Sequence, residues 1–189
     1  MNNIKSMSLQ VDREQYWTYE DSLSLPDDGR RYEIIDGVLY VSPSPRTWHQ
    51  TLSRRLQFFF YHLEVAGEGY VFNAPMDLLM PGCTPVQPDL IFLTRDQKPM
   101  IEEKAIVGVP HLLVEILSPG TRSLDRVKKL NRYAQNAVPY YLIVDPEAAC
   151  LEVLIFGTKD YHVLALSEED EWEFLGRKLD LAGLFAPLG

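Results

Sequence analysis

Apolar residues recur along the chain with two different spacings, and these spacings predict its secondary structure. Over residues 48–65, Leu52, Leu56, Phe59 and Leu63 follow one another at intervals of four, three and four, which is typical of an amphipathic helix. Short apolar runs bounded by turn residues favour strands instead. The runs 31–35 and 38–42 enclose an Asp-Gly pair, which predicts a tight β-hairpin.

The same patterns extend over most of the chain. Helices are expected over about 12–23 and 123–136, and the polar stretch 96–106 is expected to be loop with some helix. The unit 112–144 reads as strand, helix and strand, which predicts a parallel crossover. The fold class is therefore α/β, with a mixed sheet and helices packed on its faces. Further strands are expected at 70–73, 76–80, 87–94, 111–117 and 140–144, with 150–156, 161–166 and 172–174 continuing as an antiparallel set.

Two acidic residues interrupt apolar runs that otherwise predict buried strands. Asp89 lies in the run 86–93, and Glu115 lies in the run 111–117. Burial of a carboxylate is costly without a partner, and residues 95–110 are long enough to bring the second strand beside the first. Two carboxylates about 5 Å apart across neighbouring strands cannot both stay ionised without a cation. This arrangement predicts a Mg²⁺ or Mn²⁺ site; the alternative is that backbone amides or arginines satisfy each acid.

Four other residues are candidates for the same site. Lys128 and Lys129 both flank the apolar side of the predicted helix 123–136, so each is either a solvated basic residue or a group that stabilises charge on a phosphate. Glu33 is either a third acid of the site or an ordinary strand-edge glutamate. His49 lies on the inward side of its helix, where a lone histidine is more often a core hydrogen-bonding residue than a ligand.

Length and composition indicate one globular domain. The 189 residues are 46% hydrophobic and 24% charged, so we expect a single domain over 1–189 with a flexible N-terminus at 1–16. No apolar stretch approaches the roughly 18 residues of a membrane span, and the first residues do not form a signal peptide. Cys83 and Cys150 are far apart, which favours reduced thiols and a cytoplasmic protein and argues against a structural zinc site.

The net charge of −9 argues against nonspecific coating of DNA. The charge is uneven, however: residues 145–180 hold ten acidic and three basic residues, a balance of −7. Residues 122–132 hold five basic residues and one acid. Any contact with a polyanion is therefore expected to be local, with Arg122, Arg126 and Arg132 as candidates for phosphate binding.

Six fragments, in order, resemble one bacterial family, and together they span about residues 17–185. That family is the Uma-type family of "putative restriction endonucleases", within the PD-(D/E)XK nuclease superfamily. The fragments are Tyr32-Glu-Ile-Ile-Asp-Gly, Pro43 to His49-Gln50, Val86-Gln-Pro-Asp-Leu, Val109-Pro-His-Leu-Leu-Val-Glu-Ile-Leu-Ser-Pro-Gly-Thr, Asp125 through Lys129-Leu with Tyr133-Ala, and Val138-Pro-Tyr-Tyr-Leu-Ile-Val-Asp-Pro.

The resemblance implies a restriction endonuclease-like core and Mg²⁺-dependent cleavage of DNA by an activated water. It implies that Asp89 and Glu115 bind the metal and that Glu33 is an additional acid. The superfamily pattern places a lysine two residues after the second acid, whereas this chain has Leu117 there. The resemblance implies that Lys129 takes that role, with Lys128 as second choice.

Two alternative functions belong to other classes of protein. The first is a nuclease-fold protein that binds DNA or assists another subunit without cutting, and the second is an enzyme on another phosphorylated or nucleotide substrate. Restriction-type nucleases often act as symmetric dimers, so a homodimer is expected, with the apolar strand 150–156 as a candidate for pairing between subunits.

Overall fold

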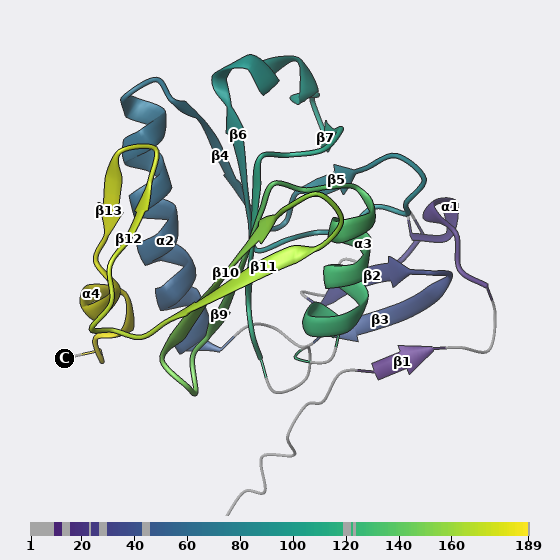
Figure 1. Cartoon of the computed structure of the whole chain (residues 1–189). Coiled ribbons are helices and arrows are strands. Elements are labelled where there is room, and N and C mark those ends of the chain that lie inside the picture. Colours follow the sequence, from purple (N-terminus) through teal and green to yellow (C-terminus); the bar gives the residue numbers. More distant parts are fainter. Residues whose placement is uncertain are drawn as a thin grey trace, which may run out of the picture.

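The computed structural model describes residues 10–12, 16–22, 24–26, 30–42, 46–118, 122 and 124–188. A six-stranded sheet lies at the centre, in the order β11-β10-β9-β8-β6-β4 (Figure 1). Only β8 and β9 run parallel among these neighbours, which confirms the predicted crossover and the mixed sheet. The strands are β4 (Gly69–Asn73), β6 (Leu90–Thr94), β8 (Leu112–Ile116), β9 (Tyr140–Asp145), β10 (Cys150–Phe156) and β11 (Tyr161–Leu166).

One face of the sheet is covered by α2 (Thr47–Val65), by the hairpin of β12 (Trp172–Phe174) and β13 (Arg177–Leu179), and by α4 (Leu181–Phe185). The predicted apolar stripe of α2 is confirmed, because Leu52, Leu56 and Phe60 are fully buried against the sheet. Burial of such a stripe is the main source of helix stability in a globular protein.

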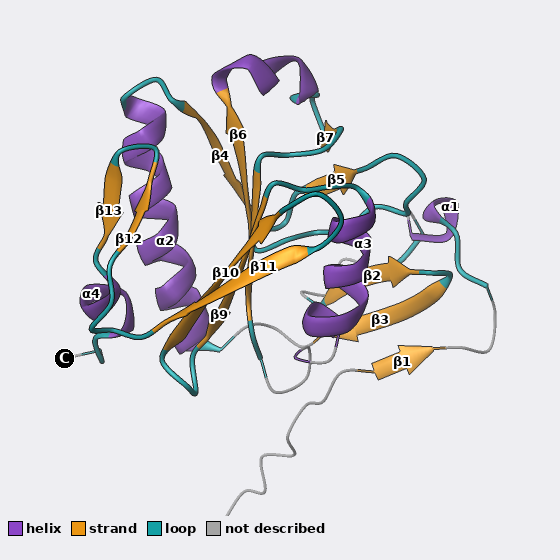
Figure 2. Ribbon diagram, in the orientation of Figure 1, coloured by secondary structure: helices purple, strands orange, loops and turns teal. Residues whose placement is uncertain are grey.

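The opposite face is covered by a continuous helical segment and by two small sheets (Figure 2). The helical segment consists of a π-helix, η2 (Leu124–Lys129), followed by α3 (Leu130–Gln135). The larger small sheet holds β1 (Gln10–Asp12), β3 (Val38–Ser42) and β2 (Arg31–Ile35) in that order, and the other pairs β5 (Asp77–Leu79) with β7 (Ala105–Val107). The middle of the central sheet is therefore buried on both faces, with the β8 residues all buried.

The predicted hairpin at Asp36-Gly37 is confirmed as β2 and β3, which pair with Ile35 opposite Val38. Both turn residues have positive φ, 54° for Asp36 and 74° for Gly37. A two-residue turn of this kind matches the twist of the strands that it joins, and asparagine, aspartate and glycine adopt it most readily.

Several expected elements differ from the structure. The helix over 12–23 is wrong: β1 ends at Asp12, and among the described residues of this range only the four-residue α1 (Tyr19–Ser22) is helical. The helix expected within the polar stretch after β6 is confirmed as the 3₁₀ helix η1 (Arg95–Met100), but the strand β7 that follows was not predicted. Strand β12 does not continue the antiparallel set, since it pairs with β13 in a separate hairpin. Neither β13 nor α4 was predicted.

Two expectations about the surface also change. Of the expected flexible N-terminus, residues 10–12 pair as β1 with β3, and residues 1–9 and 13–15 lie outside the described residues. Pairing between subunits through β10 is wrong, because β9 and β11 already flank this strand on both sides.

Cys83 and Cys150 are free thiols. In the described part of the chain, no helix has the length and apolarity needed to cross a membrane.

Candidate active site

Asp89 and Glu115 lie at the same end of two neighbouring strands. The antiparallel register of β6 and β8 pairs Leu90 with Val114; Asp89 directly precedes Leu90, and Glu115 directly follows Val114. Both acids are buried, and the Ile116 amide donates a hydrogen bond of 2.8 Å to Asp89 Oδ2. Because side chains alternate along a strand, Glu115 lies on the face of β8 that η2 and α3 cover.

Lys129 binds directly to Glu115 and to two further acids. Its Nζ lies 2.8 Å from Glu115 Oε1, 2.9 Å from Glu33 Oε1 and 3.5 Å from Asp125 Oδ1, and its side chain is 1% exposed. The expectation that neither lysine lies at the centre of the inward helix side is wrong for Lys129. The reason is the π-helical backbone of η2, whose wider turn turns Leu124, Asp125 and Lys129 inward together and leaves Val127 exposed.

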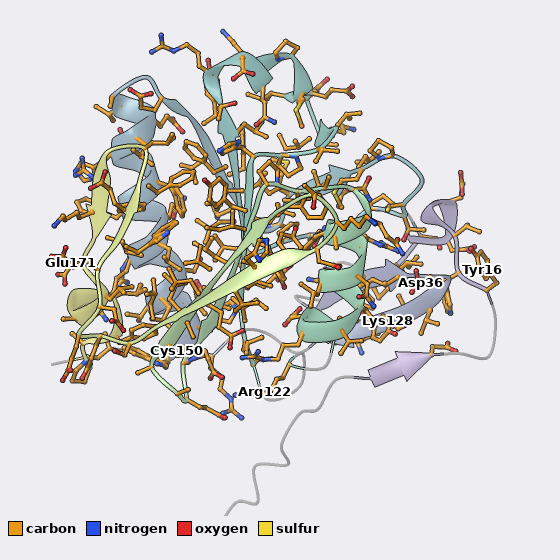
Figure 3. The ribbon with its side chains drawn as sticks, viewed as in Figure 1. Tyr16, Asp36, Arg122, Lys128, Cys150 and Glu171 are labelled. Atoms are coloured by element: carbon orange, nitrogen blue, oxygen red, sulfur yellow. The ribbon has the colours of Figure 1, made fainter. Side chains whose placement is uncertain are left out.

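Lys128 lies on the outside of the same helical turn. Its side chain is 48% exposed, and its Nζ contacts Asp36 Oδ2 at 3.2 Å. In Figure 3 both residues lie on the outer surface, on the side of the small three-stranded sheet. Of the two candidate lysines, the fold thus brings only Lys129 to the acids.

Glu33 reaches the acids from a different sheet. It lies on β2, and it is buried against Lys129. The backbone amide of Gln87 also donates a hydrogen bond of 3.3 Å to Glu33 Oε1, and the Thr84 hydroxyl donates one of 2.5 Å to the Ile34 carbonyl. These contacts hold β2 against the segment that leads into β6, so Glu33 is not an exposed strand-edge residue.

Two buried neighbours of Lys129 were not proposed as site residues. Asp125 precedes Lys129 by four residues and forms an ion pair with it, and Tyr133 follows by four and donates a hydrogen bond of 3.0 Å to Glu115 Oε1. Burial, and then the negative charge of Glu115, raise the pKa of Tyr133 well above its ordinary value, so the phenol stays protonated and continues to donate. The spacing of four is the signal that could have identified both residues.

His49 lies in the first turn of α2 and approaches the site from the other face of the sheet. Its Nε2 is 3.2 Å from Asp89 Oδ2. Its Nδ1 is buried and, within the described part of the chain, has no hydrogen-bond partner. His49 is thus placed to orient the Asp89 carboxylate rather than to pack only against the core.

The three arginines expected to bind phosphate all have acidic or backbone partners. Arg122 binds Asp145 and Glu147 at 2.6 and 2.9 Å and lies at the lower edge of the molecule in Figure 3. Arg126 forms a two-pronged pair with Glu152. Arg132 is buried; it donates to the Thr84 carbonyl at 3.0 Å and contacts Asp36 at 3.3 Å. Their role toward a phosphate stays a prediction.

The donor set suits a hard divalent cation held by few protein ligands. Among the described residues, no group of three histidine, cysteine, aspartate or glutamate side chains is arranged to hold a metal ion. Asp89 and Glu115, at the same end of two adjacent strands, nevertheless offer carboxylate oxygens. Mg²⁺ prefers oxygen ligands and usually keeps several waters, so one or two carboxylates are sufficient.

The mixed sheet with helices on its faces is a restriction endonuclease-like fold. The chain is similar to a crystal structure of a "putative nuclease belonging to DUF820" from Anabaena variabilis ATCC 29413, with a TM-score of 0.72 and 17% sequence identity. The likeness covers 89% of this chain and 97% of the other. At this identity it shows the fold alone.

The chain belongs to the Uma2 family, described as "Putative restriction endonuclease", whose family model matches residues 19–181. This confirms the family expected from the six sequence fragments. No curated protein matches the chain.

Proposed function

We propose that this protein is a Mg²⁺- or Mn²⁺-dependent DNA endonuclease that hydrolyses phosphodiester bonds. The observation that carries this proposal is the buried ammonium of Lys129, which contacts Glu115 and Glu33, while Asp89 accepts a hydrogen bond from the amide that follows Glu115. Two strand acids and a lysine meet here from segments far apart in the chain. Membership of a family described as restriction endonucleases supports DNA as the substrate.

In this proposal Asp89 and Glu115 hold the metal ion. When bound, a divalent ion polarises a phosphate and lowers the pKa of a coordinated water. Lys129 stabilises the negative charge that develops on the phosphate and orients the attacking water, while Glu33 and Asp125 fix the position of its ammonium. Tyr133 and His49 hold the two metal-binding carboxylates in place through the contacts at 3.0 and 3.2 Å.

The test is cleavage of supercoiled plasmid DNA with Mg²⁺ or Mn²⁺. Wild type is compared with Asp89→Asn, Glu115→Gln and Lys129→Met, and Lys128→Met is the matched control because this lysine lies on the surface. Circular dichroism checks that every variant is folded. We expect the three site variants to lose at least about a hundredfold in rate, as is usual when a charge-stabilising group is removed, and the control to keep its rate. Equal cleavage by all five proteins would place the activity elsewhere.

A nuclease-fold protein that binds without cutting is the second candidate. The observation that favours it is the pairing of Arg122 and Arg126 with acids, together with the net charge of −9. Calorimetric titration with Mn²⁺ distinguishes the two, since a nuclease takes up the ion and the Asp89→Asn variant does not. No Mn²⁺ uptake and no cleavage by wild type would favour the binding protein.

Substrate class and assembly have separate tests. An enzyme on a different phosphorylated substrate would show a DNA affinity with almost no salt dependence, whereas each phosphate contact steepens that dependence. The expected homodimer is checked by sedimentation velocity.

A further inference from the structure

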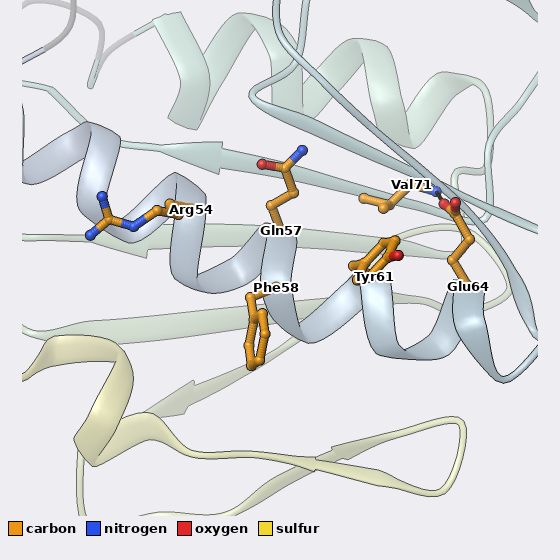
Figure 4. A pocket seen from close by; sticks show the side chains of 6 residues that line it. All are labelled: Arg54, Gln57, Phe58, Tyr61, Glu64 and Val71. Atoms are coloured by element: carbon orange, nitrogen blue, oxygen red, sulfur yellow. Dashed lines mark hydrogen bonds between the residues drawn. The ribbon is translucent and has the colours of Figure 1, made fainter.

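A shallow groove of about 310 Å³ lies between α2 and the edge strand β4. Figure 4 shows Val71 of β4 facing Tyr61 and Glu64 on the helix, with Phe58 on the far side of the helix from Gln57. Every lining residue except Val71 comes from α2. The groove is lined by Arg54, Gln57, Phe58, Tyr61, Glu64 and Val71.

Large aromatic side chains are exposed here. Phe58 is 65% exposed and Tyr61 is 52% exposed, whereas Phe59 and Phe60 on the same helix are buried in the core. Exposed aromatic rings spaced along a groove serve as stacking platforms for unpaired bases, because every base has a flat face.

The basic residues of α2 are candidates for contact with a polyanion. This helix carries Arg54, Arg55 and one acid, Glu64, whose carboxylate accepts a hydrogen bond from the Val71 amide. Arg55 donates to the carbonyls of Leu184 and Ala186 and so has a structural role. Arg54, next to it, is exposed, and in the part of the chain that the structure describes no hydrogen bond or ion pair engages its guanidinium. It is thus available to a phosphate.

One end of the groove is connected to Asp89 through β4 and α2. Gln57 donates a hydrogen bond of 2.7 Å to Asn73 at the end of β4, and the next amide, that of Ala74, donates one of 3.1 Å to the Asp89 carbonyl. Tyr61 follows His49, which contacts Asp89, by twelve residues, which is about 18 Å along an α-helix.

Strand addition by a protein partner is disfavoured at the same place. β4 is an edge strand of the central sheet, but Glu64 Oε2 accepts a hydrogen bond of 2.9 Å from the Val71 amide. This contact occupies a backbone donor that an added strand would need.

We propose that the α2–β4 groove binds a single-stranded segment of the nucleic-acid substrate, beside the site where the strand is cut. Arg54 binds a phosphate of this segment, and Tyr61, with Phe58 at the rim, stacks on unpaired bases. The inference rests on the proposed nuclease function and deepens it, since it assigns the substrate class as DNA with an unpaired tail rather than fully paired duplex.

Binding without cleavage tests the groove directly. Fluorescence anisotropy with a fluorescein-labelled oligo-dT of twelve nucleotides, and with a blunt duplex of equal length, is measured in EDTA. We expect wild type to bind the single strand more tightly than the duplex. Tyr61→Ala should weaken single-strand binding at least about fivefold, the low end of one base–aromatic stack, and Arg54→Ala should reduce its salt dependence.

Two control variants match these changes elsewhere on the surface. Val163→Ala removes an exposed apolar side chain from β11, the opposite edge of the sheet, and Arg177→Ala removes an exposed arginine from β13. Both should bind the oligonucleotide like wild type. If Tyr61→Ala and Val163→Ala bind it equally well, the proposal is overturned. A Tyr61→Ala protein that changes its sedimentation coefficient but not its oligonucleotide affinity would also overturn it, because the groove would then be a protein interface.

Failure here is distinguishable from failure of the proposed function. The binding assay contains no divalent metal, so a protein that never cuts DNA still shows whether Tyr61 contributes to single-strand affinity. Conversely, plasmid cleavage that is lost in Asp89→Asn while Tyr61→Ala leaves oligonucleotide binding unchanged would support the nuclease and refute the groove.

Discussion

Replacement of Lys129 by methionine tests the central structural feature of the site. The ammonium of this residue is 1% exposed and contacts Glu115 and Glu33 within 2.9 Å, with Asp125 at 3.5 Å. Methionine keeps most of the side-chain length but removes the positive charge. The buried acids then lose the cation that binds them, which typically costs about 3–5 kcal/mol. The surface pair of Lys128 with Asp36 is solvated and contributes about 0–1 kcal/mol.

Urea unfolding of wild type, Lys129→Met and Lys128→Met, followed by circular dichroism, measures this difference. We expect the first variant to lose about 3–5 kcal/mol of unfolding free energy and the second to stay within about 1 kcal/mol of wild type, with the denaturant slope unchanged. The double variant Lys129→Met/Glu115→Gln should recover part of the loss, because it removes one of the uncompensated charges. A Lys129→Met protein as stable as Lys128→Met would refute the buried ion cluster.

The remaining predictions concern the fold around the site. Burial and Glu115 raise the pKa of Tyr133, so the free energy of unfolding should fall above pH 10, where the unfolded phenol ionises and the folded one does not. Tyr133→Phe should lessen this fall by up to about 1.4 kcal/mol per pH unit. Urea unfolding at pH 9 and pH 11 measures the difference. Phe60→Ala should cost about 3–5 kcal/mol in the same assay, since this ring is fully buried between Phe92 and Phe174; a loss under 1 kcal/mol would contradict the packing. Gly37→Ala should lower stability by about 1–2 kcal/mol, because its φ is 74° and an added methyl group meets the Tyr16 ring.

Much of the secondary structure could be predicted from the local pattern of apolar and polar residues. The three-and-four spacing of apolar residues predicted α2, and the Asp-Gly pair predicted the β2–β3 turn. Two acids within apolar runs predicted buried carboxylates near one another, and Asp89 and Glu115 are both buried at the same end of the adjacent strands β6 and β8. These features could be predicted because strand alternation and helix periodicity are local properties of the chain.

Side-chain direction near the site depended on the tertiary structure. Periodicity could not identify Lys129 as the inward lysine, because it assumes α-helical turns and η2 is a π-helix. The approach of Glu33 required β2 to dock against the segment before β6, and the interior place of β10 required β11 to pair on its outer side. Long-range docking and an irregular helix are stabilised by contacts that form only in the folded protein. The local sequence pattern therefore does not predict them.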